Sequence, residues 1–332
     1  MHIFTQMRVT ALALAALLLS PAARADAPQL PAPAVVRHAG VAPHHNDAGD
    51  IKRGLRNEVE TSNWSGYAIG NFRTGELYRA AEATWTVHLV GYVRPRPVCH
   101  TYVYAGVTHE YCGQQHPPWE YSSSWVGIGG YCENARCTAV DQTLIQLGTE
   151  QDIASDGKTT QYYAWIEMLP NYPLLISPKF PNCNDLSCAY SVSPGDVITA
   201  SLACQSNCTP GSEQTWLLAM TNRTKNWSWS TTVTYASSLL SAVWIQEAPA
   251  TSNSILPLAN FAKVSFDPTV NNGAAPNFGL GKAGRVGPDA VLMVNPHGET
   301  SNPSIAEMSP ILDAFSTCWG NNISAIAGCR AP

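Results

Sequence analysis

The chain has 332 residues, of which 45% are hydrophobic and 9% aromatic, and this apolar content excludes a chain that is disordered throughout. Charged residues make up only 13%, about half the share in ordinary globular proteins. The formal net charge is −5 and Lys and Arg form no cluster, so we expect no nucleic-acid partner.

The N-terminus is typical of a secretory signal peptide. Arg8 supplies the charged region, Val9 to Leu19 form the apolar stretch, and Ala23-Arg24-Ala25 is a small-x-small cleavage site. The apolar run is too short to span a membrane, and no later segment has about 18 uninterrupted apolar residues. We therefore expect residues 1–25 to be a signal peptide and the protein to be secreted or periplasmic, with no membrane partner.

Residues 26–58 are rich in Pro and Ala and hold three of the nine histidines, His38, His44 and His45. A flexible linker and a propeptide are the two interpretations, and we favour the propeptide. Residues 59–332, the expected mature domain, hold 13 Lys and Arg against 20 Asp and Glu, a net charge of −7. Mild acidification charges the histidines first, so this acidic domain would hold the segment and then release it as its own carboxyl groups protonate.

From residue 61 onward, short runs rich in Val, Ile, Thr, Tyr and Trp alternate with Gly, Pro, Asn and Ser, which predicts strands throughout. No segment after the signal peptide has sustained helical spacing of apolar residues. Many short strands without helices between them favour an all-β antiparallel sandwich or barrel. The predicted strands are Trp64–Ile69, Ala83–Leu89, Ser124–Ile128, Thr143–Thr149, Tyr162–Leu169, Val197–Leu202, Thr215–Thr221, Ser228–Tyr235, Val243–Glu247, Pro257–Phe266, Ala290–Val294 and Phe315–Trp319.

Three of these strands place a polar or acidic side chain among apolar ones on the same face, because alternate residues of a strand point the same way. We expect a pocket on the sheet where these faces meet. The three sets are Tyr163, Trp165 and Glu167; Leu144, Gln146, Gly148 and Glu150; and Val243, Ile245 and Glu247.

The ten cysteines all follow residue 98, and an exported protein favours disulfides over metal ligation. No CxxC motif is present, and His109-Glu110 lacks the second His of a zinc-protease helix, so we expect no metal. Sequence alone leaves the connectivity open. The simplest pairing joins sequence neighbours: 99–112, 132–137, 183–188, 204–208 and 318–329.

Seven short motifs follow one another along residues 61–319. They are NWSG at 63–66, SWVGIGG at 124–130, LIQLG at 144–148, YAWIEMLP at 163–170, SPGD at 193–196, SAVWIQE at 241–247 and PLANF at 257–261. In this order they resemble the glutamic peptidases, or eqolisins (peptidase family G1). The resemblance implies a concanavalin A-like antiparallel two-sheet β-sandwich and a secreted, cofactor-free acid endopeptidase. Its partners would be polypeptide substrates and its own propeptide as inhibitor, and we expect a monomer.

The resemblance also implies a catalytic dyad of Gln146, in the Q-x-G strand, and Glu247, the last residue of the motif that corresponds to A-E-W-I-V-E. A surface Gln and a solvated strand end are the plain alternatives for these two residues. Family acids are replaced by Gly129, Tyr163 and Val243, and the Asp after L-Q-T-G by Glu150. These losses bear on the pH optimum and the subsites more than on the reaction.

The chemistry supports the dyad independently of the family. A histidine base would be protonated in acid, whereas a carboxylate with a pKa near 4 still accepts a proton from water. A side-chain amide does not titrate, so it donates a hydrogen bond to an oxyanion at any pH. We therefore expect Glu247 to activate water and Gln146 to stabilise the oxyanion.

The resemblance places Trp64, Trp125 and Trp165 around the substrate cleft, although each could be a core aromatic. Glu167 is either a hydrogen-bonded support group or a second acid of the pocket, and Glu150 is either a substrate-binding acid or a surface acid. Two other functions are compatible with such a sandwich. One is a glycoside hydrolase that uses Glu167 and Glu247 as its pair of carboxyl groups, and the other is a carbohydrate-binding lectin.

Overall fold

The computed structural model describes residues 36–38, 40, 58–93, 97–104, 106–114, 117–176, 189–271, 273–274, 276, 287–304 and 314–320. The chain divides into residues 1–31 and 32–332, and every described residue belongs to the second unit. The expected signal peptide and most of the expected propeptide lie outside the described residues. Within the described ranges, no helix is long and apolar enough to cross a membrane.

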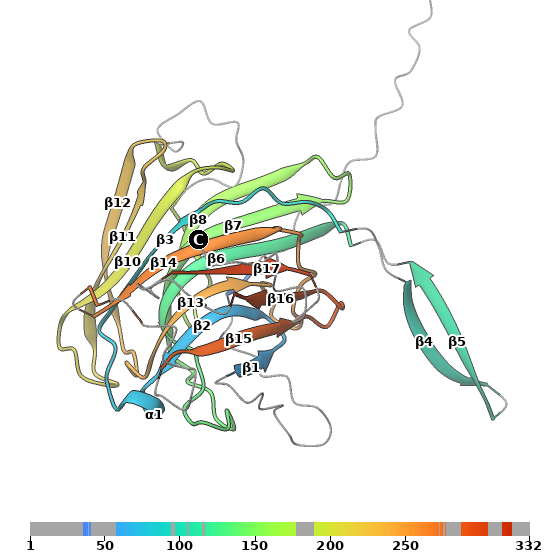
Figure 1. The fold of residues 1–332 in the computed structure, drawn as a ribbon, viewed down its shortest axis with the longest axis horizontal. Helices are drawn as coiled ribbons and strands as arrows, with labels where there is room; N and C mark the ends of the chain where they lie inside the picture. Colours follow the sequence, from blue (N-terminus) through green and yellow to red (C-terminus); the bar gives the residue numbers. More distant parts are fainter. Residues whose placement is uncertain are drawn as a thin grey trace, which may run out of the picture. The chain divides into compact units, whose positions relative to one another are not determined.

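The described part of the chain is built almost entirely of strands, with one α-helical turn, α1 (Asn71–Thr74) (Figure 1). The strands are β1 (Glu58–Thr61), β2 (Trp64–Gly70), β3 (Ala80–Thr86), β4 (Pro97–Tyr104), β5 (Val107–Gln114), β6 (Trp119–Gly129), β7 (Leu144–Ala154), β8 (Thr160–Met168), β9 (Leu174–Leu175), β10 (Val197–Ser206), β11 (Gln214–Asn222), β12 (Trp227–Tyr235), β13 (Ser241–Glu247), β14 (Lys263–Val270), β15 (Asp289–Val294), β16 (Thr300–Pro303) and β17 (Phe315–Trp319).

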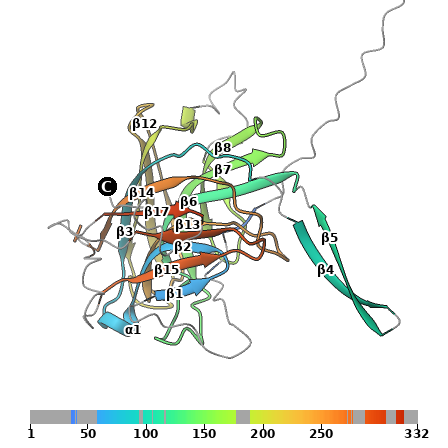
Figure 2. The same ribbon diagram turned by 45° about the vertical axis from the view of Figure 1, so that its right-hand side comes forward.

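These strands form one continuous sheet in the order β12-β11-β10-β3-β14-β17-β16-β15-β2-β13-β6-β7-β8-β9, while β4 and β5 pair separately. All pairs of the sheet are antiparallel except β1 with β15. The sheet folds over so that β3, β10, β11 and β14 cover one face of β13, β6, β7 and β8 (Figures 1 and 2). This arrangement confirms the predicted antiparallel two-sheet β-sandwich.

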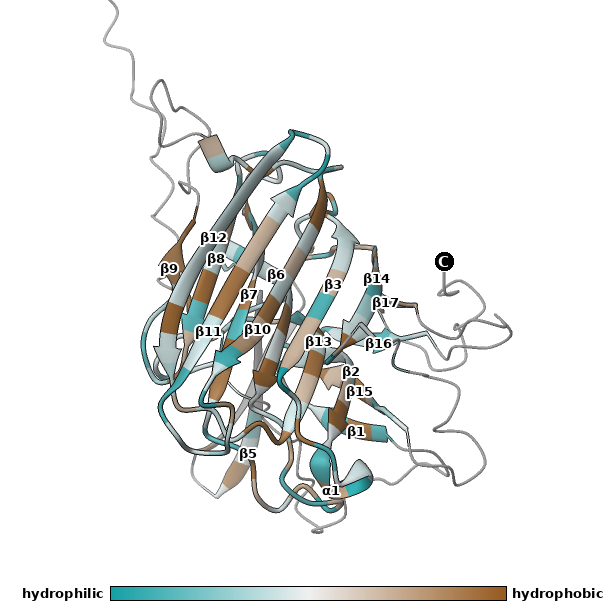
Figure 3. Ribbon diagram, turned by 90° about the vertical axis from the view of Figure 1, so that its left-hand side faces the viewer, coloured by the Kyte–Doolittle hydropathy of each residue, from teal (hydrophilic) through white to brown (hydrophobic). Residues whose placement is uncertain are grey.

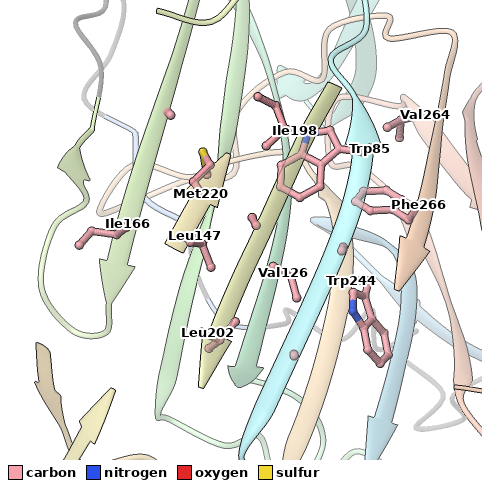
Figure 4. Packing of buried hydrophobic residues seen from close by; sticks show 14 of the residues in the cluster. Trp85, Val126, Leu147, Ile166, Ile198, Leu202, Met220, Trp244, Val264 and Phe266 are labelled. Atoms are coloured by element: carbon pink, nitrogen blue, oxygen red, sulfur yellow. The ribbon is translucent and has the colours of Figure 1, made fainter. Parts of the chain in front are cut away.

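The main core lies between the two layers. Trp85 and Phe266 from one layer face Leu147 and Trp244 from the other, and all four are essentially inaccessible to water (Figure 4). Hydrophobic and hydrophilic bands follow one another along the strands (Figure 3). Because Leu147 points into this core, its neighbours at positions 146 and 148 point to the opposite face of β7.

The predicted strand at 257–266 is wrong in its first half, since β14 begins only at Lys263. Pro257 has no N–H to give to a ladder, and Ala262 has a φ of 54°, which breaks an extended backbone. Residues 258 and 260 therefore make only single bridges, to Tyr121 and Gly91. The strand at Phe315–Trp319 agrees with β17, whereas the short β1, β9 and β16 and the hairpin strands β4 and β5 were not predicted.

Two of the five predicted disulfides, Cys132–Cys137 and Cys204–Cys208, are present. Residues 99 and 112 lie directly opposite each other in the β4–β5 hairpin. Cys318 is also disulfide-bonded, and the remaining cysteines, at positions 183, 188 and 329, lie outside the described residues. The two observed disulfides close short loops at element ends, so they stabilise local turns and do not join the two layers of the sandwich.

Candidate active site

The strand register gathers the polar side chains of three strands on one face of the sheet, the face turned away from the main core. Ser123 of β6 lies opposite both Glu247 of β13 and Glu150 of β7. Four residues further along β6, Gly127 lies opposite Gln146 of β7, and Gln146 in turn lies opposite Glu167 of β8. The amide and the three acids thus share one face, as their alternation predicts, and all four are fully buried.

A glycine on β7 makes room for two tryptophan side chains of the neighbouring strands. Gly148 lies between Trp125 and Trp165 in the register, and a Cβ at this position would lie 2.4 Å from the Trp125 Cβ and 2.5 Å from the Ser124 carbonyl oxygen. No real side chain tolerates such contacts, so only glycine lets the two indoles occupy the face together.

Gly148→Ala should therefore destabilise the protein by about 1–3 kcal/mol, the usual effect of overpacking, and should lower activity by displacing Trp125. Urea unfolding and proteolysis measured on the same samples would check both effects. Gly91→Ala is the matched control, because the nearest atom to a Cβ there is 3.8 Å away. Equal stability of the two variants would contradict this account of Gly148.

The three tryptophans of this face have different roles. Trp125 donates its indole N–H to the Glu247 Oε2 atom at 2.8 Å, and Trp64 packs edge-on against it with ring centroids 4.9 Å apart. A hydrogen bond from the Trp64 side chain also reaches Glu247. Trp165 instead donates to Ser123 Oγ at 3.2 Å and presents its ring face to the site. Two of the indoles thus orient the acid, and the third forms a flat wall.

An extended segment from the expected propeptide lies on this face. Its Arg37 forms an antiparallel bridge with Ala250, with N···O distances of 2.7 and 2.9 Å. The His38 N–H donates to Glu167 Oε2 at 2.8 Å, and the His38 carbonyl oxygen accepts a hydrogen bond from Gln146 Nε2 at 2.6 Å.

Further along the segment, the Gly40 carbonyl accepts a hydrogen bond from Asn63 Nδ2 at 3.2 Å. The segment is therefore held by backbone groups on both sides of residue 39. Side chains of the sandwich thus bind the backbone of the segment on the face of the sheet.

The imidazole of His38 is fully buried among the acids. It stacks on the Trp165 ring with centroids 3.5 Å apart and planes 4° apart. Its Nδ1 atom lies 3.3 Å from Glu247 Oε2, and its Nε2 atom lies 3.6 Å from Glu150 Oε2. The sequence indicated only that His38 gains charge on acidification, and it did not predict the burial of this imidazole between two acids.

Burial sets the protonation of the acids in this state. It raises the pKa of Glu167 to about 8, against the opposing effects of the His38 N–H and the Arg37 charge. Burial also raises the pKa of Glu247 well above its ordinary value, with Glu167 repulsion adding to the rise and the Trp125 hydrogen bond opposing it. With the segment bound, burial therefore favours the protonated form of both carboxyl groups.

Three residues of the site were missed at the sequence level. Asp152 raises the pKa of Glu150 further, after burial itself, and it follows that acid by two positions on the same face of β7. Ser123 precedes Trp125 by two positions on β6, so the same alternation could have identified both residues. Asn63 lies before β2 in a loop, where no periodicity indicates its direction.

The acids of this face are not arranged as a metal site. In the described part of the chain, no group of three or more His, Cys, Asp and Glu side chains could hold a metal ion.

A model described as the Peptidase A4 family matches residues 62–287, more than half of the chain. No curated protein sequence matches the chain. The similar solved structures include scytalido-glutamic peptidase with a peptide-based transition state analog, at 18% identity and a TM-score of 0.48, covering 78% of this chain and 98% of that one. SCP-B, an eqolisin in a complex with the tripeptide Ala-Ile-His, is 17% identical with a TM-score of 0.46, covering 78% of this chain and 98% of that one. Aspergilloglutamic peptidase from Aspergillus niger is 22% identical with a TM-score of 0.42, covering 60% of this chain and 99% of that one.

Proposed function

Because this chain belongs to the Peptidase A4 family, the glutamic peptidases, and is a peptide hydrolase, we propose that it is a secreted acid endopeptidase with Gln146 and Glu247 as its catalytic pair. The observation that carries the proposal is a peptide carbonyl bound by Gln146 with Glu247 beside the same residue. Gln146 donates to the His38 carbonyl oxygen at 2.6 Å, and Glu247 Oε2 lies 3.3 Å from Nδ1 of the His38 imidazole. An amide that binds a peptide carbonyl and a neighbouring acid are the two groups that acid hydrolysis of a peptide bond needs.

In the proposed reaction, Glu247 takes a proton from water as the water attacks the carbonyl carbon. The negative charge that develops on the carbonyl oxygen is stabilised by the Gln146 amide, which is worth about 3–4 kcal/mol for one well-placed donor. Glu247 then returns the proton to the leaving nitrogen. Trp125 and Trp64 hold the acid in position through their indole N–H groups.

We further propose that the pro-segment, residues 26–58, inhibits the enzyme until it is removed. With the segment bound, the Glu247 carboxyl is fully buried and its pKa lies well above the ordinary value, chiefly because of that burial. Burial thus favours the protonated carboxyl, which cannot act as a base. Loss of the segment would hydrate Glu247 and lower its pKa toward the ordinary value, which favours the carboxylate that the reaction needs.

The raised pKa values also predict how the stability of the proenzyme depends on pH. Burial, with repulsion from Glu299, raises the pKa of Glu120 to about 8, although the Val93 N–H opposes this. A carboxyl whose folded pKa is raised binds its proton more tightly in the folded state. The contribution of this proton to the free energy of unfolding is complete below the pKa of the group in the unfolded chain, about 4.3. As the pH rises from there to the pKa in the folded protein, the contribution falls by up to about 1.4 kcal/mol per pH unit.

Glu120→Gln should therefore match the parent protein near pH 4 and exceed it in stability near pH 8. The measurement is urea unfolding at several pH values, made in a Glu247→Gln background so that the protein does not digest itself. A difference that stays constant with pH, or that has the opposite sign, would show that Glu120 titrates normally.

The experiment that tests the proposed function is digestion of unfolded casein between about pH 2 and 8, after acid pretreatment of the proenzyme. We expect activity in the acid range only. A parallel assay on β-glucan covers the glycosidase interpretation. Activity on β-glucan without activity on casein would overturn the proposal.

A further inference from the structure

We propose that the imidazole of His38 is the group that makes the pro-segment an inhibitor, and that it binds in a pocket for histidine-bearing peptides formed by Trp165, Glu150 and Glu247. The proposal rests on the proposed function and adds to it the contact by which the site is regulated. The class of ligand is an extended peptide with a histidine at this position, and the first such ligand is the chain's own segment.

The pocket borders the imidazole on three sides. Trp165 stacks on the ring, with centroids 3.5 Å apart and planes 4° apart. At the ring edge, Nδ1 lies 3.3 Å from Glu247 Oε2 and Nε2 lies 3.6 Å from Glu150 Oε2. The ring and both carboxyl groups are fully buried. Because buried carboxyl groups need polar partners, the pocket fits a flat ring with a nitrogen toward each acid.

Other side chains fit this pocket less well. A phenyl ring would keep the stacking on Trp165 but would turn carbon atoms toward both acids. A leucine side chain would lose the stacking and the nitrogen contacts together. We therefore expect histidine to bind here more tightly than phenylalanine or leucine.

The imidazole also explains why the bound segment blocks the reaction. Glu247 Oε2 accepts the Trp125 N–H at 2.8 Å, and the His38 Nδ1 atom is a second group at the same oxygen. Gln146 meanwhile holds the carbonyl oxygen of His38 at 2.6 Å. One residue of the segment thus engages both members of the proposed pair, its carbonyl at the amide and its ring at the acid. In this state burial raises the pKa of Glu247, which favours the protonated form of the acid.

The backbone contacts of the segment do not depend on its sequence. The His38 N–H donates to Glu167, and the Arg37 backbone pairs with Ala250. Any residue other than proline could make these hydrogen bonds. The Arg37 guanidinium lies over the Tyr172 ring, 4.5 Å from its centre. His38 is therefore the residue whose side chain joins the segment to the proposed pair.

Glu150 is the acid of the pocket that is not a member of the proposed pair. Its Oε2 atom faces the far nitrogen of the imidazole. A hydrogen bond joins its carboxyl to Asp152, two positions further along the same face of β7. Glu150→Gln therefore tests the pocket while both Gln146 and Glu247 stay in place.

The first test compares full-length proenzymes at about pH 5 by their initial rates on unfolded casein, before any acid pretreatment. We expect His38→Phe to be about tenfold or more faster than the parent, because its ring has no nitrogen to face the acids. His44→Phe changes another histidine of the same segment and should stay as inactive as the parent. Equal rates for His38→Phe and the parent would overturn the inference, and so would equal release in both variants.

The second test leaves the proenzyme unchanged. It measures inhibition of the acid-activated enzyme by the peptide of residues 34–41, Ala-Val-Val-Arg-His-Ala-Gly-Val, and by versions with Phe or Leu in place of the histidine. We expect the inhibition constant of the histidine peptide to be about tenfold lower than that of the Phe peptide, and Glu150→Gln to reduce this ratio severalfold. Glu120→Gln, which changes a buried acid bonded to the Val93 N–H, is the matched control and should keep the ratio.

The outcomes for the pocket and for the proposed function are distinct. Equal inhibition by the three peptides, with casein digestion intact, would overturn the histidine pocket alone. If the acid-activated parent digests no casein at any pH, the proposed function fails, and the regulatory role of the pocket fails with it.

Discussion

Glu247→Gln should reduce digestion of unfolded casein at about pH 4 by 10²–10⁴-fold or abolish it, while the protein stays folded. An amide oxygen still accepts the hydrogen bond that Trp125 donates to this position at 2.8 Å, so the indole keeps its partner. An amide takes no proton from water, so the step that activates the nucleophile is lost. Activity per folded molecule, with folding checked by urea unfolding, is the measurement.

Glu120→Gln is the matched control for this variant. Glu120 is another buried acid of the sandwich, on β6, and its carboxyl accepts the Val93 N–H at 2.6 Å. Its pKa of about 8 makes it neutral near pH 4, where glutamine reproduces both its shape and its charge. The control should keep full activity. Full activity in Glu247→Gln as well would end the assignment of Glu247 as the base.

The face on which the site lies was predictable because a strand has a period of two. Gln146 and Glu150 share a face of β7 whatever their neighbours, and the same holds for Trp165 and Glu167 on β8. The sequence does not fix which strands are adjacent. The pairing of β13 with β6, which brings the Trp125 indole to Glu247, depends on packing between segments more than 100 residues apart.

The place of His38 could not be predicted for a different reason. Its segment has no periodicity and a composition typical of a linker, and its position comes from contacts with three separate strands. These contacts also join two proposals that were independent at the sequence level, the propeptide and the dyad. A segment that buries Glu247 raises the pKa of that acid, so the same contact that fills the site also removes the base.

Gln146→Leu should lower kcat by about 10²–10³-fold with a smaller effect on KM, because the oxyanion donor contributes mainly in the transition state. Leucine keeps most of the volume of this fully buried side chain but cannot donate to the carbonyl now held at 2.6 Å. Glutamine does not titrate, so the pH profile of the remaining activity should keep its shape. Steady-state kinetics between about pH 2 and 6 would measure both effects.

The variant Gln151→Leu tests whether the loss of any buried amide on β7 would lower kcat in the same way. Gln151 is equally buried on the same strand, but it points to the opposite face and donates to Thr149 Oγ1 at 2.7 Å. Its replacement removes a buried hydrogen bond at a cost of about 1–3 kcal/mol in stability and leaves the carbonyl-binding amide in place. We therefore expect Gln151→Leu to lose stability but not kcat, and Gln146→Leu to lose kcat. Turnover within threefold of the parent in Gln146→Leu would mean that another donor stabilises the oxyanion.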